Sequence, residues 1–165
     1  MENKFNHTIS ILVVNKAGVL TRVAQVFARR GFNIDSLVVS SSFDKKFARM
    51  TITAQGDGEN LGQIKKQLSK LIDVMHCIEH DDMDSITKEL ALIKISCGID
   101  KRAEILQVVE HFACKTVDLT QKSMVIQATG NSDKLDAMIH LLKAYNIIEL
   151  VRTGKVLMAR GDADT

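Results

Sequence analysis

This 165-residue sequence has few cysteines, few aromatic side chains and no large excess of either charge. Its three cysteines, Cys77, Cys97 and Cys114, are an odd number without regular spacing, which argues against a disulfide scaffold and favours a reducing compartment. No apolar run approaches the roughly 20 residues that a membrane-spanning helix needs. Because residues 1–6 also lack the apolar core of a signal peptide, we expect a cytoplasmic protein that binds no membrane.

The balanced charge and the scarce aromatic residues also narrow the class of partner. Residues 1–84 carry 11 basic and 10 acidic side chains, and residues 85–165 again carry 11 and 10, which gives the net charge of +2. Neither half is a basic arm of the kind that binds nucleic acid. Residues 48–55, a predicted strand, contain no aromatic side chain, whereas an RNA-binding sheet of this size stacks bases on aromatics. We therefore expect no nucleic-acid partner.

The first half of the chain has the pattern of a small α+β unit. We predict a strand ending at Val14, a helix to Arg30, strands at 34–40 and 47–55, a second helix and a strand at 74–78. Within 48–55, apolar residues alternate with Arg49, Thr51, Thr53 and Gln55, so one face of the sheet should be buried and the other more polar. The second helix is predicted to start at an Asp57 N-cap. Its apolar stripe consists of Leu61, Ile64, Leu68, Leu71 and Ile72.

The second half repeats this order. A strand through residues 91–97 precedes a helix with Asp100 as its expected cap, and strands at 116–120 and 124–129 form a hairpin around Gln121 and Lys122. A helix after Ser132 and a strand at 147–151 complete the unit. The fold class is α+β, with two successive ferredoxin-like βαββαβ units, and we assign residues 1–80 and 90–165 to the two domains and 81–89 to a linker. Unpaired sheet edges predict self-association.

Residues 15–37 suit the binding of a small zwitterion. Gly18 ends a strand–loop segment, and the helix after it begins with backbone N–H groups that have no internal partner and can donate to an anion. Gly31 stops that helix, and Asn33 follows with an amide that both donates and accepts hydrogen bonds. Gly18 as a simple turn and Asn33 as a tolerant loop residue remain the alternative.

Candidate catalytic residues are few. The cluster His76, Cys77, His80, Asp81 and Asp82 has side chains that zinc accepts, but its spacing fits no closed ligand set. If 73–78 is a strand, adjacent side chains point to opposite faces, which argues against joint ligation. The thiols at 97 and 114 lie in apolar company, so we expect them to be inert core groups. We predict no catalytic residue and no metal site.

Several motifs together resemble one family, the regulatory (small) subunits of acetolactate synthase, also called acetohydroxyacid synthase. The first unit is similar to their ACT domain, and the resemblance covers nearly the whole chain, including the second unit and the tail. The motifs that carry it are Asn15-x-x-Gly18-x-Leu20-x-Arg22-Val23, Phe27-x-x-Arg30-Gly31-Phe32-Asn33-Ile34, Arg49-Met50-Thr51-Ile52, Glu89-Leu90-Ala91-Leu92-Ile93-Lys94 and Glu149-x-Val151-Arg152-Thr153-Gly154.

The resemblance implies a regulator without an active site of its own. Such proteins activate a large catalytic subunit and confer feedback inhibition by a branched-chain amino acid, usually valine. Thiamine diphosphate, magnesium and FAD would belong to that partner, and this chain would hold no cofactor. In the family the effector pocket lies between two ACT domains of a homodimer. The effector-binding residues that it implies here are Asn15, Ala17, Gly18, Val19, Leu20, Asn33 and Ile34.

Two other functions are compatible with the sequence. One is an amino-acid-sensing double ACT protein that regulates a transcription factor. The other is a small enzyme that uses the cluster at residues 76–82, which would have to bind a metal.

Overall fold

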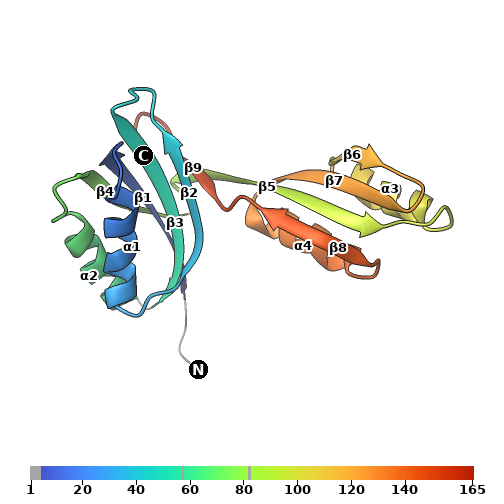
Figure 1. Cartoon of the computed structure of the whole chain (residues 1–165), viewed down its shortest axis with the longest axis horizontal. Coiled ribbons are helices and arrows are strands. Elements are labelled where there is room, and N and C mark those ends of the chain that lie inside the picture. The colour runs from blue at the N-terminus through green and yellow to red at the C-terminus, as the bar shows by residue number, and fades with distance from the viewer. Residues whose placement is uncertain (1–4, 57, 82) are drawn as a thin grey trace. The chain divides into compact units, whose positions relative to one another are not determined.

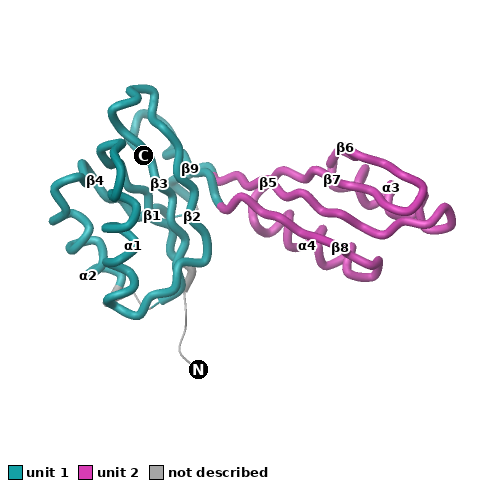
Figure 2. Tube along the Cα trace, viewed as in Figure 1, with its two compact units in different colours: residues 1–86, 155–165 teal, residues 87–154 magenta. Residues whose placement is uncertain are grey.

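A computed structural model describes residues 5–56, 58–81 and 83–165 of the chain. It contains two compact units, one formed by residues 1–86 with 155–165 and the other by residues 87–154 (Figure 2). Each unit combines an antiparallel sheet with two helices in the order βαββαβ. The predicted fold class, α+β with two ferredoxin-like units, is therefore confirmed.

In the first unit the sheet has the strand order β2-β3-β1-β4, so β1 and β3 are central and β2 and β4 are its edges (Figure 1). All neighbouring strands are antiparallel. The elements are β1 (Phe5–Val14), α1 (Val19–Arg29), β2 (Ile34–Ser41), β3 (Phe47–Gly56), α2 (Gly58–Leu68) and β4 (Val74–His80).

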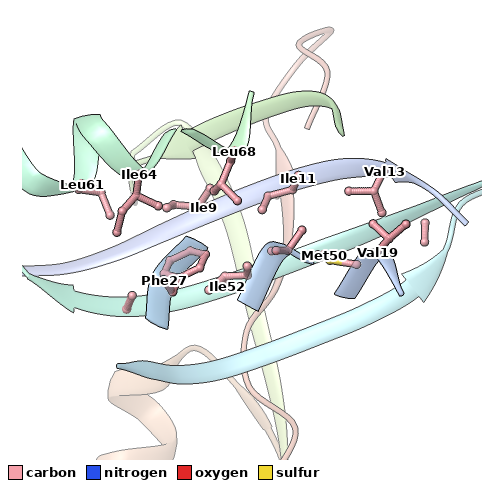
Figure 3. Close-up of a cluster of buried hydrophobic side chains, with 13 residues drawn as sticks. Ile9, Ile11, Val13, Val19, Phe27, Met50, Ile52, Leu61, Ile64 and Leu68 are labelled. Atoms are coloured by element: carbon pink, nitrogen blue, oxygen red, sulfur yellow. The ribbon is translucent and has the colours of Figure 1, made fainter. Parts of the chain in front are cut away.

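One face of this sheet packs against both helices. The alternation predicted for β3 is confirmed on the core side, where Met50 and Ile52 are 3% and 0% exposed (Figure 3). The side chains of the core come from the two central strands and the inner stripes of α1 and α2, as 3.6-residue periodicity requires. They are Ile9, Ile11, Val13, Val19, Val23, Phe27, Ala48, Met50, Ile52, Ala54, Leu61, Ile64 and Leu68.

The second helix ends earlier than its apolar stripe suggested. Helix α2 stops at Leu68, and tighter i→i+3 bonds such as Leu71 N–H to the Leu68 carbonyl replace the helical ladder. As a result Ile72 is 93% exposed, so its assignment to the buried stripe is wrong. The predicted cap Asp57 lies outside the described residues.

The second unit has the strand order β6-β7-β5-β8, and its core draws on the same element types as the first. The predicted hairpin is confirmed, with the Thr120 N–H donating to the Ser123 carbonyl at 2.8 Å. Its elements are β5 (Ser85–Ser96), α3 (Arg102–His111), β6 (Lys115–Leu119), β7 (Ser123–Gly130), α4 (Ser132–Leu142) and β8 (Ile147–Arg152).

The helix caps of the second unit differ from the sequence prediction. The N-cap of α3 is Lys101, which makes no side-chain cap bond, so the cap assigned to Asp100 is wrong. Helix α4 is capped by Asn131, whose side-chain oxygen accepts from the Lys134 N–H at 3.1 Å. Asn131 supplies the usual short polar cap one residue before the helix start.

The domain boundaries drawn from the sequence also differ from the two units. Residues 155–165, which we assigned to the second domain, belong to the first unit and contain β9 (Val156–Ala159), which pairs with β5. Most of the expected linker, residues 81–89, also belongs to a strand, because β5 already starts at Ser85. Strand β9 has only four residues, and a segment so short has too little periodicity to predict which unit it belongs to.

The polar face of the first sheet receives the end of this tail. The carbonyl oxygen of Thr165 accepts hydrogen bonds from the guanidinium of Arg49 on β3 and from Nε2 of His76 on β4, the latter at 2.9 Å. Threonines on this face, such as Thr51 and Thr53, are only 5% and 8% exposed. The face is polar as predicted, but it is not open to solvent along its centre.

Candidate functional site

The loop between β1 and α1 is held in place by a backbone and a side-chain hydrogen bond of Asn15. Asn15 N–H donates to the Lys46 carbonyl at 2.7 Å, and the Asn15 amide nitrogen donates to the Lys45 carbonyl at 3.1 Å. Both contacts tie the loop to the turn between β2 and β3. Gly18 ends the loop with φ 83°, a left-handed conformation that is costly for any residue with a Cβ.

The start of α1 has no side-chain cap. The first helical bond with good geometry runs from the Arg22 N–H to the Gly18 carbonyl at 3.1 Å, whereas the Val19 N–H lies 3.5 Å from the Lys16 carbonyl. Leu20 is 43% exposed at this first turn. An uncapped helix start with its positive dipole end at the surface is a place where a carboxylate can bind.

The predicted site residues of this loop have different surroundings. Asn15, Ala17 and Gly18 are exposed, so their backbone or amide groups are accessible. Val19 is only 2% exposed and belongs to the core of the first unit. Within one chain its side chain therefore faces the core, and only its backbone belongs to the loop surface.

An acidic residue that the sequence analysis missed lies beside this loop. Asp73, directly before β4, has a side chain that is 5% exposed, and it forms ion pairs with Lys16 (Nζ–Oδ1 2.6 Å) and Arg22 (Nη2–Oδ2 2.5 Å). The pairing with Lys16 and Arg22 lowers the pKa of the Asp73 carboxyl below its usual range, although burial opposes this shift. Nothing in the local sequence marks Asp73, because its partners are more than 50 positions away.

The second part of the predicted site lies where α1 ends. Gly31, with φ 69°, ends the helix, and the Phe32 N–H returns to the Phe27 carbonyl at 3.1 Å. Asn33 is exposed, and its amide nitrogen lies 3.3 Å from Oδ1 of Asp35. Ile34 begins the edge strand β2 and packs partly against the core.

Within one chain these two parts are far apart. Helix α1 has 11 residues and lies between them, which separates its ends by about 16 Å at 1.5 Å per residue. A free amino acid is less than half that length. The structure therefore brings together the residues at 15–20 but does not bring Asn33 or Ile34 to them in the same chain.

The alternative cluster on β4 is divided between the two faces of the sheet. Cys77 packs against the core, and burial raises its pKa to about 11. His76 faces the tail, and Nε2 of His80 is 2.6 Å from the Ser10 hydroxyl. The predicted alternation of adjacent side chains is confirmed; Asp82 lies outside the described residues. Across the positions that the structure covers, no group of three or more His, Cys, Asp or Glu side chains is arranged to hold a metal ion.

The other two cysteines lie among apolar side chains, as predicted. Cys97 is fully buried in the core of the second unit, and Cys114 packs partly against it. Burial raises the pKa of the Cys114 thiol. Among the helices that could be searched, none is long and apolar enough to cross a membrane.

Both halves of the chain match models of known protein families. A model described as the AHAS small subunit-like ACT domain matches residues 9–76, and one described as the small subunit of acetolactate synthase matches residues 88–161. Together they cover both βαββαβ units.

Individual relatives agree with these matches. The acetolactate synthase small subunit of Mycobacterium bovis is 43% identical over 155 residues, which cover 94% of this chain and 92% of the relative. A probable acetolactate synthase small subunit from Archaeoglobus fulgidus is 45% identical over 156 residues, with 94% and 98% covered. The crystal structure of the acetolactate synthase small subunit from Thermotoga maritima is 39% identical, covers 96% of this chain and 99% of its own, and superposes with a TM-score of 0.86.

Proposed function

Because the chain belongs to the family of acetolactate synthase small subunits, we propose that it is a non-catalytic regulatory subunit that activates the large catalytic subunit and makes it sensitive to feedback inhibition. The proposed inhibitor is a branched-chain amino acid, with valine as the first candidate. Thiamine diphosphate, magnesium and FAD are expected in the catalytic subunit, and the assembly is expected in the cytoplasm. The main observation that supports an effector site is the uncapped start of α1, which follows the exposed loop at residues 15–18.

The ligand carboxylate would bind at this helix start. Backbone N–H groups at Gly18 and Leu20 would donate to it there, together with the Val19 N–H, whose bond to the Lys16 carbonyl is long at 3.5 Å, and the helix dipole favours a negative charge at this end. Ala17 lies at the exposed surface of the loop, and the Asn15 amide offers polar atoms beside it. Such a site suits an α-amino acid better than an uncharged ligand, because both its charged groups have complementary partners.

The second half of the site would come from another copy of the chain. Asn33 and Ile34 lie at the start of β2, an edge of the first sheet. Strand β2 has the sequence IDSLVVSS, with a single charged residue and no proline, and its one register shift lies between Ile34 and Ser36, so residues 36–41 have little protection against edge pairing. Pairing β2 with β2 of a second copy by two-fold symmetry would build a homodimer and bring Asn33 of one chain toward residues 15–20 of the other.

Binding at such an interface can be coupled to the catalytic subunit. A ligand that bridges two chains stabilises one arrangement of the dimer relative to others, and a coupling of about 1–3 kcal/mol changes affinity or activity by about 5- to 150-fold. That range is sufficient for feedback inhibition of ordinary size.

A reconstituted synthase assay tests this proposal. Adding the full chain to the purified catalytic subunit is expected to raise the rate of acetolactate formation, and valine, leucine or isoleucine is expected to reverse that increase. The absence of both effects would refute the regulatory role. Recovery of a DNA-binding protein without a synthase in a pull-down would favour the transcriptional alternative instead.

A further inference from the structure

Asp73 contacts the end of β1, the loop after it and the first turn of α1, through its backbone and its side chain. Its carbonyl oxygen accepts from the Val14 N–H at 2.9 Å, which joins the end of β1 to the start of β4. Oδ1 is paired with Lys16 in the loop, and Oδ2 with Arg22 in the first turn of α1. The loop and the helix start are thus fixed relative to each other through one buried carboxylate.

Asp73 is not placed to contact the ligand itself. Its side chain is 5% exposed, and each of its oxygens already accepts from a cation. The cations, by contrast, are accessible, since the side chains of Lys16 and Arg22 are 55% and 43% exposed. Nη1 of Arg22 would lie 3.4 Å from a Cβ placed on Gly18, so the guanidinium is directly beside the glycine of the loop.

Charge at this helix end determines what it attracts. Lys16, Arg22 and the positive end of α1 would together attract any anion, whether or not that anion carries an ammonium group. The carboxylate of Asp73 cancels one of the two side-chain charges. This reduces the general attraction for anions and the repulsion of a ligand ammonium group.

We propose that Asp73 is a positioning residue that makes the effector site selective for zwitterionic amino acids over carboxylic acids without an ammonium group. It acts through Lys16 and Arg22, by fixing the loop and by balancing its charge. This inference rests on the proposed function, and it adds the class of ligand that the site rejects.

Calorimetric titration of the full chain tests the inference. Valine and 3-methyl-2-oxobutanoate, the oxo acid with the same carbon skeleton, are compared in the wild type and in Asp73→Asn. Removing the negative charge that pairs with Lys16 and Arg22 at the helix start is expected to lower the ratio of valine affinity to oxo-acid affinity by about tenfold. An unchanged ratio in a folded Asp73→Asn protein would overturn the proposal.

Two further variants separate charge balance from a purely structural role. Adding Lys16→Met to Asp73→Asn restores the net charge and is expected to recover most of the ratio, which a merely structural role of Asp73 would not do. Lys16→Met alone, with Asp73 intact, should raise the ratio, and this variant decides the question if Asp73→Asn fails to fold. A ratio that does not rise in Lys16→Met would then refute the proposal.

The matched control is Asp136→Asn in the second unit, which removes another acid–arginine pair, Asp136 with Arg152 at 2.5 Å. It should leave the affinity ratio unchanged, and an equal change in this variant would refute the role of Asp73. If the wild type binds no branched-chain amino acid, the proposed effector site fails together with this inference. If it binds valine but the ratios do not respond to the variants, only the role of Asp73 fails.

Discussion

Asn15 and Asn33 lie at opposite ends of helix α1, four residues before its first residue Val19 and four residues after its last residue Arg29. The helix between them is about 16 Å long, so one amino acid cannot touch both in the same chain. If both asparagines serve one ligand, two chains must contribute to each site. This geometry leads to two predictions that can be tested on the synthase.

Single substitutions in either half should remove inhibition without removing activation. Gly18→Asp places a side chain on a residue with φ 83° and a negative charge at the helix start, where it repels the ligand carboxylate. Asn33→His replaces the amide on the opposite side of the site. Both variants should activate the catalytic subunit but lose valine inhibition, and calorimetry should show valine affinity at least about tenfold weaker.

Matched controls use the same residue changes elsewhere. Gly62→Asp lies on α2 with open space around its Cβ position, and Asn146→His is exposed in the second unit. Both controls should retain inhibition. Wild-type valine affinity in Gly18→Asp and Asn33→His would contradict the assignment of these residues to the site.

Mixed dimers should recover part of the lost inhibition. In a dimer of one Gly18→Asp chain and one Asn33→His chain, one of the two shared sites combines an intact loop with an intact Asn33. Random mixing makes half of the dimers mixed, so about a quarter of all sites should bind valine, as two-fold symmetry predicts. Co-expressed chains with two different tags allow the mixed dimer to be purified and titrated. If each site lies within one chain, no binding returns.

The packing of α2 makes a prediction about stability. Leu68 is fully buried, whereas Ile72, four residues later, is 93% exposed. Leu68→Ala should lower the free energy of unfolding by about 2–5 kcal/mol, because it leaves a cavity in the core. Ile72→Ala should change it by less than about 0.5 kcal/mol. Denaturant titration of both variants measures the difference, and a similar loss in both would contradict the packing described for α2.

Elements with long, regular periodicity were predictable from the sequence. The alternation in β3 and the stripe of α1 each place several apolar side chains on one face, so the buried sets around Met50 and Val23 follow from residue spacing alone. Ile72 was misassigned because its spacing would continue the apolar stripe of α2, whereas the helix ends at Leu68, one turn before it. Beyond Leu68 the Lys70 and Leu71 N–H groups make i→i+3 bonds in place of helical ones, and the apolar pattern does not indicate this change.

Contacts between distant positions were not predictable in this way. Asp73 contacts Lys16 and Arg22 because the start of β4 lies beside the loop after β1, and no local sequence pattern indicates that contact. The same holds for Thr165, which reaches Arg49 across 116 positions. The loop at residues 15–18 could be predicted as a candidate binding site because a strand, a glycine and a helix start follow one another directly in the sequence.

The contact between Arg49 and the tail predicts a local effect on dynamics. Arg49→Met removes a charged donor to the Thr165 carbonyl, and bonds of this kind contribute about 1.5–3 kcal/mol. We expect hydrogen exchange of the amides at residues 156–165 to become roughly tenfold or more faster, with little change in α1. Arg29→Met, an exposed position on α1, is the control. Unchanged exchange in the tail would mean that Arg49 does not hold it.

The stability of the first unit should depend on pH through His80. Its pKa is lowered from the usual 6.5, mainly by burial and also by the charge of Arg49, while Asp81 opposes the shift and His76 adds to it. The folded state therefore binds this proton less readily than the unfolded state, so the stability contribution is present above pH 6.5 and decreases as pH falls below it. His80→Gln can keep a hydrogen bond to Ser10 without titrating and should flatten the decrease. The decrease in stability is measured by hydrogen exchange of the β1 and β4 amides between about pH 7.5 and pH 5.5, corrected for intrinsic exchange. His140→Gln in the second unit is the control. A wild-type stability that rises as the pH falls would contradict the direction of the His80 shift.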